Sequence, residues 1–66
     1  MLKFCYYLLT IKYKSLDLIY KVIHDNKGVI IDRNFDQNVT LKIRVSTSTK
    51  ALIEKKFPTT KIQSLA

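Results

Sequence analysis

The N-terminal segment, residues 2–13, constrains the fold more than any other stretch of this sequence. Its apolar side chains occupy both even and odd positions, which point to opposite faces of a strand. Phe4, Tyr6 and Leu8 are at even positions, and Cys5, Tyr7, Leu9 and Ile11 are at odd ones. Such a run, rich in aromatic residues, is typical of a β-strand that is buried on both faces. We therefore expect this segment to be a central strand of a sheet.

The same run superficially resembles the apolar part of a secretory signal peptide, because Lys3 precedes it. It is too short to span a bilayer, which takes about 20 residues, and residues 10–14 offer no small-x-small cleavage site. Cys5 is the single cysteine and has no partner for an intrachain disulfide, which favours a reducing compartment. We expect a cytoplasmic protein that does not enter the membrane.

A helix is predicted after this strand. Ser15 is the expected N-cap, because its hydroxyl can accept a hydrogen bond from a backbone amide of the first turn. The negative charge of Asp17 would lie near the positive end of the helix dipole. Lys27 in the last turn, followed by Gly28 in a left-handed conformation, would end the helix. The apolar face that would cover the sheet consists of Leu16, Ile19, Tyr20 and Ile23, widened by Leu18 and Val22.

Residues 29–35 and 39–45 are predicted to form a β-hairpin, with residues 36–38 as its turn. We expect the acids Asp32 and Asp36 to help form this turn. The second arm alternates cleanly between the two faces of a sheet. Its buried face is expected to hold Val39, Leu41, Ile43 and Val45, and its solvent face Thr40, Lys42 and Arg44.

A second helix is expected over residues 50–57, capped by one of the serines and threonines at 46–49. Ala51 and Leu52 are expected to face inward, with Ile53 as a third candidate. Pro58 ends this helix because the residue before a proline is disfavoured in helical dihedrals. Residues 59–65, with Ile62 as the strongest apolar position, are predicted to be a strand at the edge of the sheet.

The order β-α-β-β-α-β is that of the split βαβ pattern. It predicts an α+β, ferredoxin-like sandwich in which a four-stranded antiparallel sheet of order 4-1-3-2 carries two helices on one face. A chain of 66 residues is expected to form one domain, covering residues 1–66. The other face of the sheet is then left open to water or to a partner.

The chain has too few chemically versatile residues for most catalysis. One His, one Cys and one Gly cannot supply four zinc ligands or a glycine-rich phosphate loop. Cys5 has no second His as a base, and His24 is expected to be a solvated helix residue. An acylphosphatase-like enzyme would need an arginine in a phosphate-cradling loop, and residues 13–15 supply neither arginine nor glycine. We expect no enzyme, metal site or small-molecule cofactor.

Charge gives the first indication of a partner. Twelve Lys and Arg against five Asp and Glu leave a net charge of +7, which favours RNA or the ribosome. If Leu9 and Ile11 face the helices, the open face would hold the candidate site Phe4, Tyr6, Leu8 and Lys12 beside Lys42 and Arg44. RNA-recognition domains stack bases on aromatics in this setting. Strand 39–45 has no outward aromatic, however, which favours docking of a companion domain or a second copy.

Three segments carry a resemblance to a known family: residues 13–20, residues 28–32 and residues 38–45. They place a tyrosine before the first helix, a glycine after it, and an acidic residue ahead of the alternating Val-x-Leu-x-Ile-x-Val. With them the chain resembles the C-terminal domain of the YigZ/IMPACT family, a ferredoxin-like module similar to a C-terminal domain of elongation factor G. Because Met1 immediately precedes the first strand, we expect a detached or truncated module that lacks the family's N-terminal domain.

The resemblance implies a translation-associated, non-enzymatic module, and it carries over no catalytic residues. Its expected partners are RNA, the ribosome or a companion N-terminal domain. The alternative is a structural homodimerisation module, or a truncated family fragment without independent activity.

Overall fold

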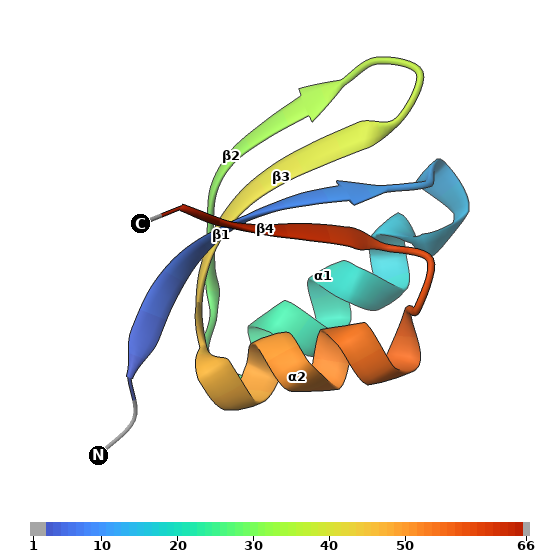
Figure 1. Ribbon diagram of the computed structural model, residues 1–66. Helices are drawn as coiled ribbons and strands as arrows, with labels where there is room; N and C mark the ends of the chain where they lie inside the picture. The colour runs from blue at the N-terminus through green and yellow to red at the C-terminus, as the bar shows by residue number, and fades with distance from the viewer. Residues whose placement is uncertain (1–2, 66) are drawn as a thin grey trace.

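The computed structural model describes residues 3–65, and its element order is the predicted one (Figure 1). The four strands form one antiparallel sheet in the order β2-β3-β1-β4, which is the predicted order 4-1-3-2 read from the other edge. Both helices cover one face of the sheet, so the ferredoxin-like α+β fold is confirmed. The elements are β1 (Phe4–Ile11), the short 3-10 turn η1 (Tyr13–Ser15), α1 (Leu16–Asp25), β2 (Val29–Phe35), β3 (Val39–Ser46), α2 (Thr47–Lys56) and β4 (Lys61–Leu65).

β1 lies between β3 and β4, as predicted for a central strand. Tyr7, Leu9 and Ile11 point to the helices and are buried. The expectation that β1 is buried on both faces is wrong. Phe4 is 39% exposed and Tyr6 is 47% exposed, because no element among residues 3–65 covers the other face of the sheet. Leu8, between its two strand neighbours, is half-buried.

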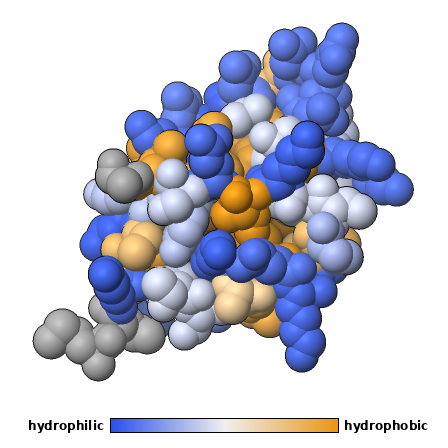
Figure 2. Space-filling view, viewed as in Figure 1, coloured by the Kyte–Doolittle hydropathy of each residue, from blue (hydrophilic) through white to orange (hydrophobic). Residues whose placement is uncertain are grey.

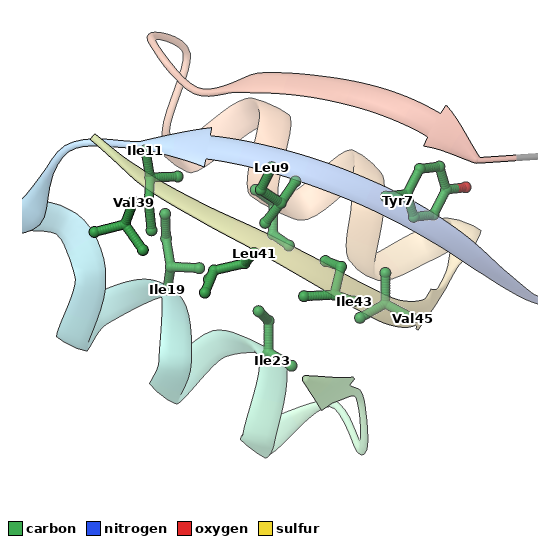
Figure 3. Close-up of a cluster of buried hydrophobic side chains, with 10 residues drawn as sticks. Tyr7, Leu9, Ile11, Ile19, Ile23, Val39, Leu41, Ile43 and Val45 are labelled. Atoms are coloured by element: carbon green, nitrogen blue, oxygen red, sulfur yellow. The ribbon is translucent and has the colours of Figure 1, made fainter. Parts of the chain in front are cut away.

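The hydrophobic core lies between the sheet and the helices (Figure 3). The predicted alternation of β3 is confirmed, since Val39, Leu41, Ile43 and Val45 are each 0% exposed. Ile19 and Ile23 of α1 pack onto this row, as their helical spacing predicts. Leu18 is 58% exposed and contributes little, because it lies on the solvent side of the α1 stripe.

The two ends of α1 differ in detail from the prediction. Ser15 precedes the helix but makes no side-chain capping bond, because η1 leads directly into α1 and Ser15 already has helical dihedrals (φ −96°, ψ −4°). At the other end, Lys27 takes the left-handed conformation with φ 61°, and Gly28 does not. Gly28 is needed for space instead, because a Cβ there would lie 2.6 Å from Val45 Cγ1 and 2.8 Å from Ile23 Cγ2.

α2 begins three residues earlier than predicted, at Thr47. Its N-cap is Ser46, whose Oγ accepts a hydrogen bond from the Thr49 amide at 3.2 Å. The inward residues are Thr49 and Ile53, one helical turn apart, so Ala51 is exposed and Leu52 is only half-buried. Burial of Thr49 is tolerated because its hydroxyl bonds to Ser46 Oγ at 2.9 Å.

β4 pairs only with β1 and is therefore an edge strand, as predicted. It begins at Lys61, two residues later than expected, after a turn in which the Thr60 amide donates to the Phe57 carbonyl. Ile62 is opposite Leu9 and packs against the core.

Candidate binding face of the sheet

The candidate site is the side of the sheet that faces away from α1 and α2, which we call the open face. Because directly paired residues of antiparallel strands point to the same side, the register determines which residues belong to it. Figure 2 shows the molecule from the side on which β4 and α2 lie, where apolar residues reach the surface between hydrophilic ones. The open face consists of Phe4, Tyr6, Leu8 and Thr10 of β1, Thr40, Lys42 and Arg44 of β3, Val29, Asp32 and Asn34 of β2, and Lys61, Gln63 and Leu65 of β4.

Five of the six predicted site residues come together on the two central strands. Tyr6 lies directly opposite Arg44, and Leu8 lies directly opposite Lys42. The Arg44 guanidinium carbon is 5.1 Å from the centroid of the Phe4 ring, a cation–π contact. Each apolar side chain in the middle of the open face therefore has a cation beside it.

Lys12 is the predicted residue that does not join this cluster. It is exposed and follows the last residue of β1. It lies six positions after Tyr6, or about 20 Å along an extended chain. Its neighbours are instead Lys61 and a group of hydroxyl side chains at the end of the sheet.

The charges of the open face are largely free of internal pairing. Within residues 3–65 the only ion pair joins Lys50 to Glu54 on α2, at 2.9 Å. Lys42 and Arg44 are both exposed and neither is held in an ion pair there. Asp32 lies directly opposite Lys42 and is the one acidic member of the open face as defined above. The face therefore presents cations to an incoming ligand.

The sequence prediction missed several members of the open face. Asp32 belongs to β2, which runs from Val29 to Phe35, and not to a turn. A bulge between Ile30 and Asp32 shifts the register and places Asp32 on the open face, opposite Lys42. Lys61 and Gln63 were missed although a signal exists. Once Ile62 faces the helices, its two neighbours must point the other way. The bulge has no such signal in the sequence.

The side chains considered for catalysis lie apart from the open face. His24 is exposed on α1, and Cys5 is half-buried on the helix side of β1. Burial raises the pKa of the Tyr7 hydroxyl above its ordinary value, and the neighbouring Cys5 side chain adds to this effect. In residues 3–65 no three His, Cys, Asp or Glu residues gather as metal ligands would. The same part of the chain holds no helix of the length and apolarity needed to cross a membrane.

Comparison with known proteins identifies the fold only. No protein-family model matches the sequence, and no curated protein matches it. A solved structure described as "Crystal structure of an hypothetical protein" is similar, with a TM-score of 0.81 and 16% sequence identity over 96% of this chain. The chain spans 33% of that protein. At this identity the similarity supports the ferredoxin-like architecture and says nothing about ligands.

Proposed function

We propose that this chain is a non-enzymatic binding module whose open face contacts RNA, either free or within the ribosome. The observation that carries the proposal is the direct pairing of open-face side chains of β1 with cations of β3: the exposed Tyr6 with Arg44, and the half-buried Leu8 with Lys42. The resemblance to the C-terminal domain of the YigZ/IMPACT family supports a translation-associated role in the cytoplasm. No cofactor and no membrane take part in this function.

The chemistry of single-stranded RNA fits this face. Exposed aromatic rings stack on bases of any sequence, and neighbouring lysines and arginines neutralise phosphates and release counterions. Tyr6 is 47% exposed and Phe4 is 39% exposed, so both rings are accessible from solvent. The net charge of +7 attracts a polyanion from a distance.

The position of the cations on the open face favours RNA over a protein as the partner. The cores of protein–protein interfaces are depleted of charged residues, and of lysine in particular. Lys42 and Arg44 lie on the central strand β3, next to the apolar residues that would form such a core. A protein partner would have to desolvate the Lys42 ammonium there, whereas an RNA phosphate would pair with it.

The second candidate is docking of a companion domain or a second copy of the chain. It is favoured by the apolar part of the open face, formed by Phe4, Tyr6, Leu8, Val29 and Leu65. Val29 is 50% exposed, and no aromatic residue of β3 belongs to this face. Exposed apolar area of this kind is common at interaction surfaces.

The test is the salt dependence of binding to a labelled single-stranded oligouridine of about ten nucleotides. We expect Lys42→Ala combined with Arg44→Ala to reduce the slope of log K against log salt by about 1.4, at about 0.7 per phosphate contact. Tyr6→Ala is expected to weaken binding by about 1–3 kcal/mol, the usual contribution of one stacked base. Anisotropy titrations between low and physiological salt give both values.

The matched control is Lys21→Ala combined with Lys55→Ala. These lysines are exposed on α1 and α2, so the control removes two charges from the opposite side of the molecule. An equal loss of slope in both double variants would mean that only the net charge matters. Absent or salt-independent binding at low salt would remove the RNA proposal.

Sedimentation velocity distinguishes the second candidate. Docking of a second copy predicts self-association of the wild-type chain that Tyr6→Ala weakens. A stable monomer at high concentration, together with salt-sensitive RNA binding, supports the first candidate.

A further inference from the structure

A polar pocket lies at the end of the open face, where β1 leaves the sheet. Four segments far apart in the sequence form it: the end of β1, η1, the turn between β2 and β3, and the connection from α2 into β4. In Figure 1 the end of β1 and the start of β4 lie on the same side of the molecule. The polar residues that line the pocket are Thr10, Lys12, Ser15, Asn38, Thr59, Thr60 and Lys61.

The lining presents hydrogen-bond donors and positive charge. The lining residues carry two ammonium groups, four hydroxyls and one amide, and no acidic residue belongs to the lining. Within residues 3–65 none of these seven side chains makes a hydrogen bond or an ion pair to the protein. Asp17, which follows η1, and Asp36, which lies in the turn between β2 and β3, do not line the pocket. The donors are therefore available to an anion.

The pocket is of a suitable size for a phosphate group. Its volume is about 160 Å³, whereas about 10–15 Å³ by the same kind of measure holds one water. A phosphate group has five non-hydrogen atoms, and there is room for part of an attached sugar. Two lysines match a phosphate monoester, which carries about −1.5 to −2 charges at neutral pH, better than a singly charged diester.

The pocket is continuous with the open face. Thr10 belongs to both, and Lys61 is directly opposite Thr10 across the β1–β4 pair. A nucleic-acid strand that follows β1 from Tyr6 would reach this pocket where the sheet ends. We propose that the pocket binds the terminal phosphate monoester of a single-stranded RNA whose bases lie on the open face. This inference rests on the proposed function for the source of the phosphate.

The experiment compares short oligouridines of about six nucleotides that carry a 5′-phosphate, a 3′-phosphate or only hydroxyl ends. We expect one of the two phosphorylated forms to bind about 5–10-fold more tightly than the hydroxyl form. Lys12→Ala combined with Lys61→Ala should abolish this preference. The control, Lys21→Ala combined with Lys55→Ala, should keep it. Equal affinities for all three oligomers in the wild type would overturn the inference.

Two further measurements keep this test separate from that of the proposed function. Tyr6→Ala should lower the affinity for all three oligomers but keep the ratio of these affinities. Loss of stacking can therefore be distinguished from loss of the preference for a terminal phosphate. Inorganic phosphate, followed by amide chemical shifts of Ser15, Asn38 and Thr60, tests the pocket without RNA. Saturable shifts support an anion site, but shifts without any preference for phosphorylated ends would overturn the assignment to RNA termini.

Discussion

Replacement of Gly28 by alanine tests the reason for the only glycine in the chain. The new Cβ would lie 2.6 Å from Val45 Cγ1 and 2.8 Å from Ile23 Cγ2, about 1 Å inside the optimal carbon–carbon separation of ~3.5–4.0 Å. Val45 is 0% exposed and Ile23 is 1% exposed, so neither side chain can swing into solvent. Overpacking of a core costs about 1–3 kcal/mol. We expect Gly28→Ala to cost about 2 kcal/mol, from the middle of that range.

The assay is urea and thermal unfolding followed by circular dichroism. A loss of about 2 kcal/mol corresponds to a melting temperature lower by about 8–16 °C in a domain of this size. It is a large part of the ~3–5 kcal/mol that so small a core supplies. Adding Val45→Ala removes the closest atom, so the double variant should show a favourable coupling of at least about 0.5 kcal/mol.

Lys27→Gly is the control at the adjacent position. Lys27 has φ 61°, and the left-handed conformation costs a residue with a Cβ about 1–2 kcal/mol. After the greater entropy loss of glycine, we expect a net stabilisation of up to about 1 kcal/mol. Unchanged stability of Gly28→Ala, or equal costs with and without Val45, would refute the steric explanation.

Three other predictions concern the cap of α2, its buried face and alkaline pH. Ser46→Ala should lower the free energy of unfolding by about 1 kcal/mol, because the Thr49 amide loses its hydrogen-bond acceptor. The control Ser15→Ala removes no capping bond and should change the free energy of unfolding in urea by less than about 0.5 kcal/mol. Ile53→Ala should cost about 2–5 kcal/mol, and a similar cost for the half-buried Leu52→Ala would contradict the observed helix face. Burial raises the folded-state pKa of Tyr7 above its ordinary value of about 10. The contribution of the neutral Tyr7 side chain to the free energy of unfolding is therefore complete below pH ~10 and is lost as pH rises through the folded pKa. Unfolding between pH 8 and 11.5 should therefore show a steeper alkaline loss of stability in the wild type than in Tyr7→Phe, and identical curves would exclude this origin.

The elements that the sequence predicts well are those whose side chains repeat with a clear period. The alternation of Val39 to Val45 fixes which face of β3 is buried, and the spacing of Ile19 and Ile23 fixes the inward side of α1. α2 lacks such a period. Its inward face includes the polar Thr49, so the prediction chose Ala51 and Leu52. Thr49 can be buried only because Ser46 satisfies its hydroxyl, a pairing that depends on where the helix begins.

The candidate site shows the same division. The alternation of side chains along β1 predicts that Phe4, Tyr6 and Leu8 share a face, and the hairpin pattern places Lys42 and Arg44 on the same face of the sheet. Which cation lies beside which side chain depends on the register, and the register follows from the tertiary pairing of β1 with β3, whose partners are 28 to 42 positions apart in the chain.

The sequence by itself determined the order of elements, the buried face of β3 and the sign of the charge, because these follow from local periodicity and composition. Only the tertiary structure decided which cation of β3 lies beside each open-face side chain of β1, that Gly28 serves close packing, and that Lys12 and Lys61 line one pocket. Each of these depends on atoms brought together from distant segments. Local patterns record which way a side chain points along its own element, but they do not record what the rest of the chain places against it.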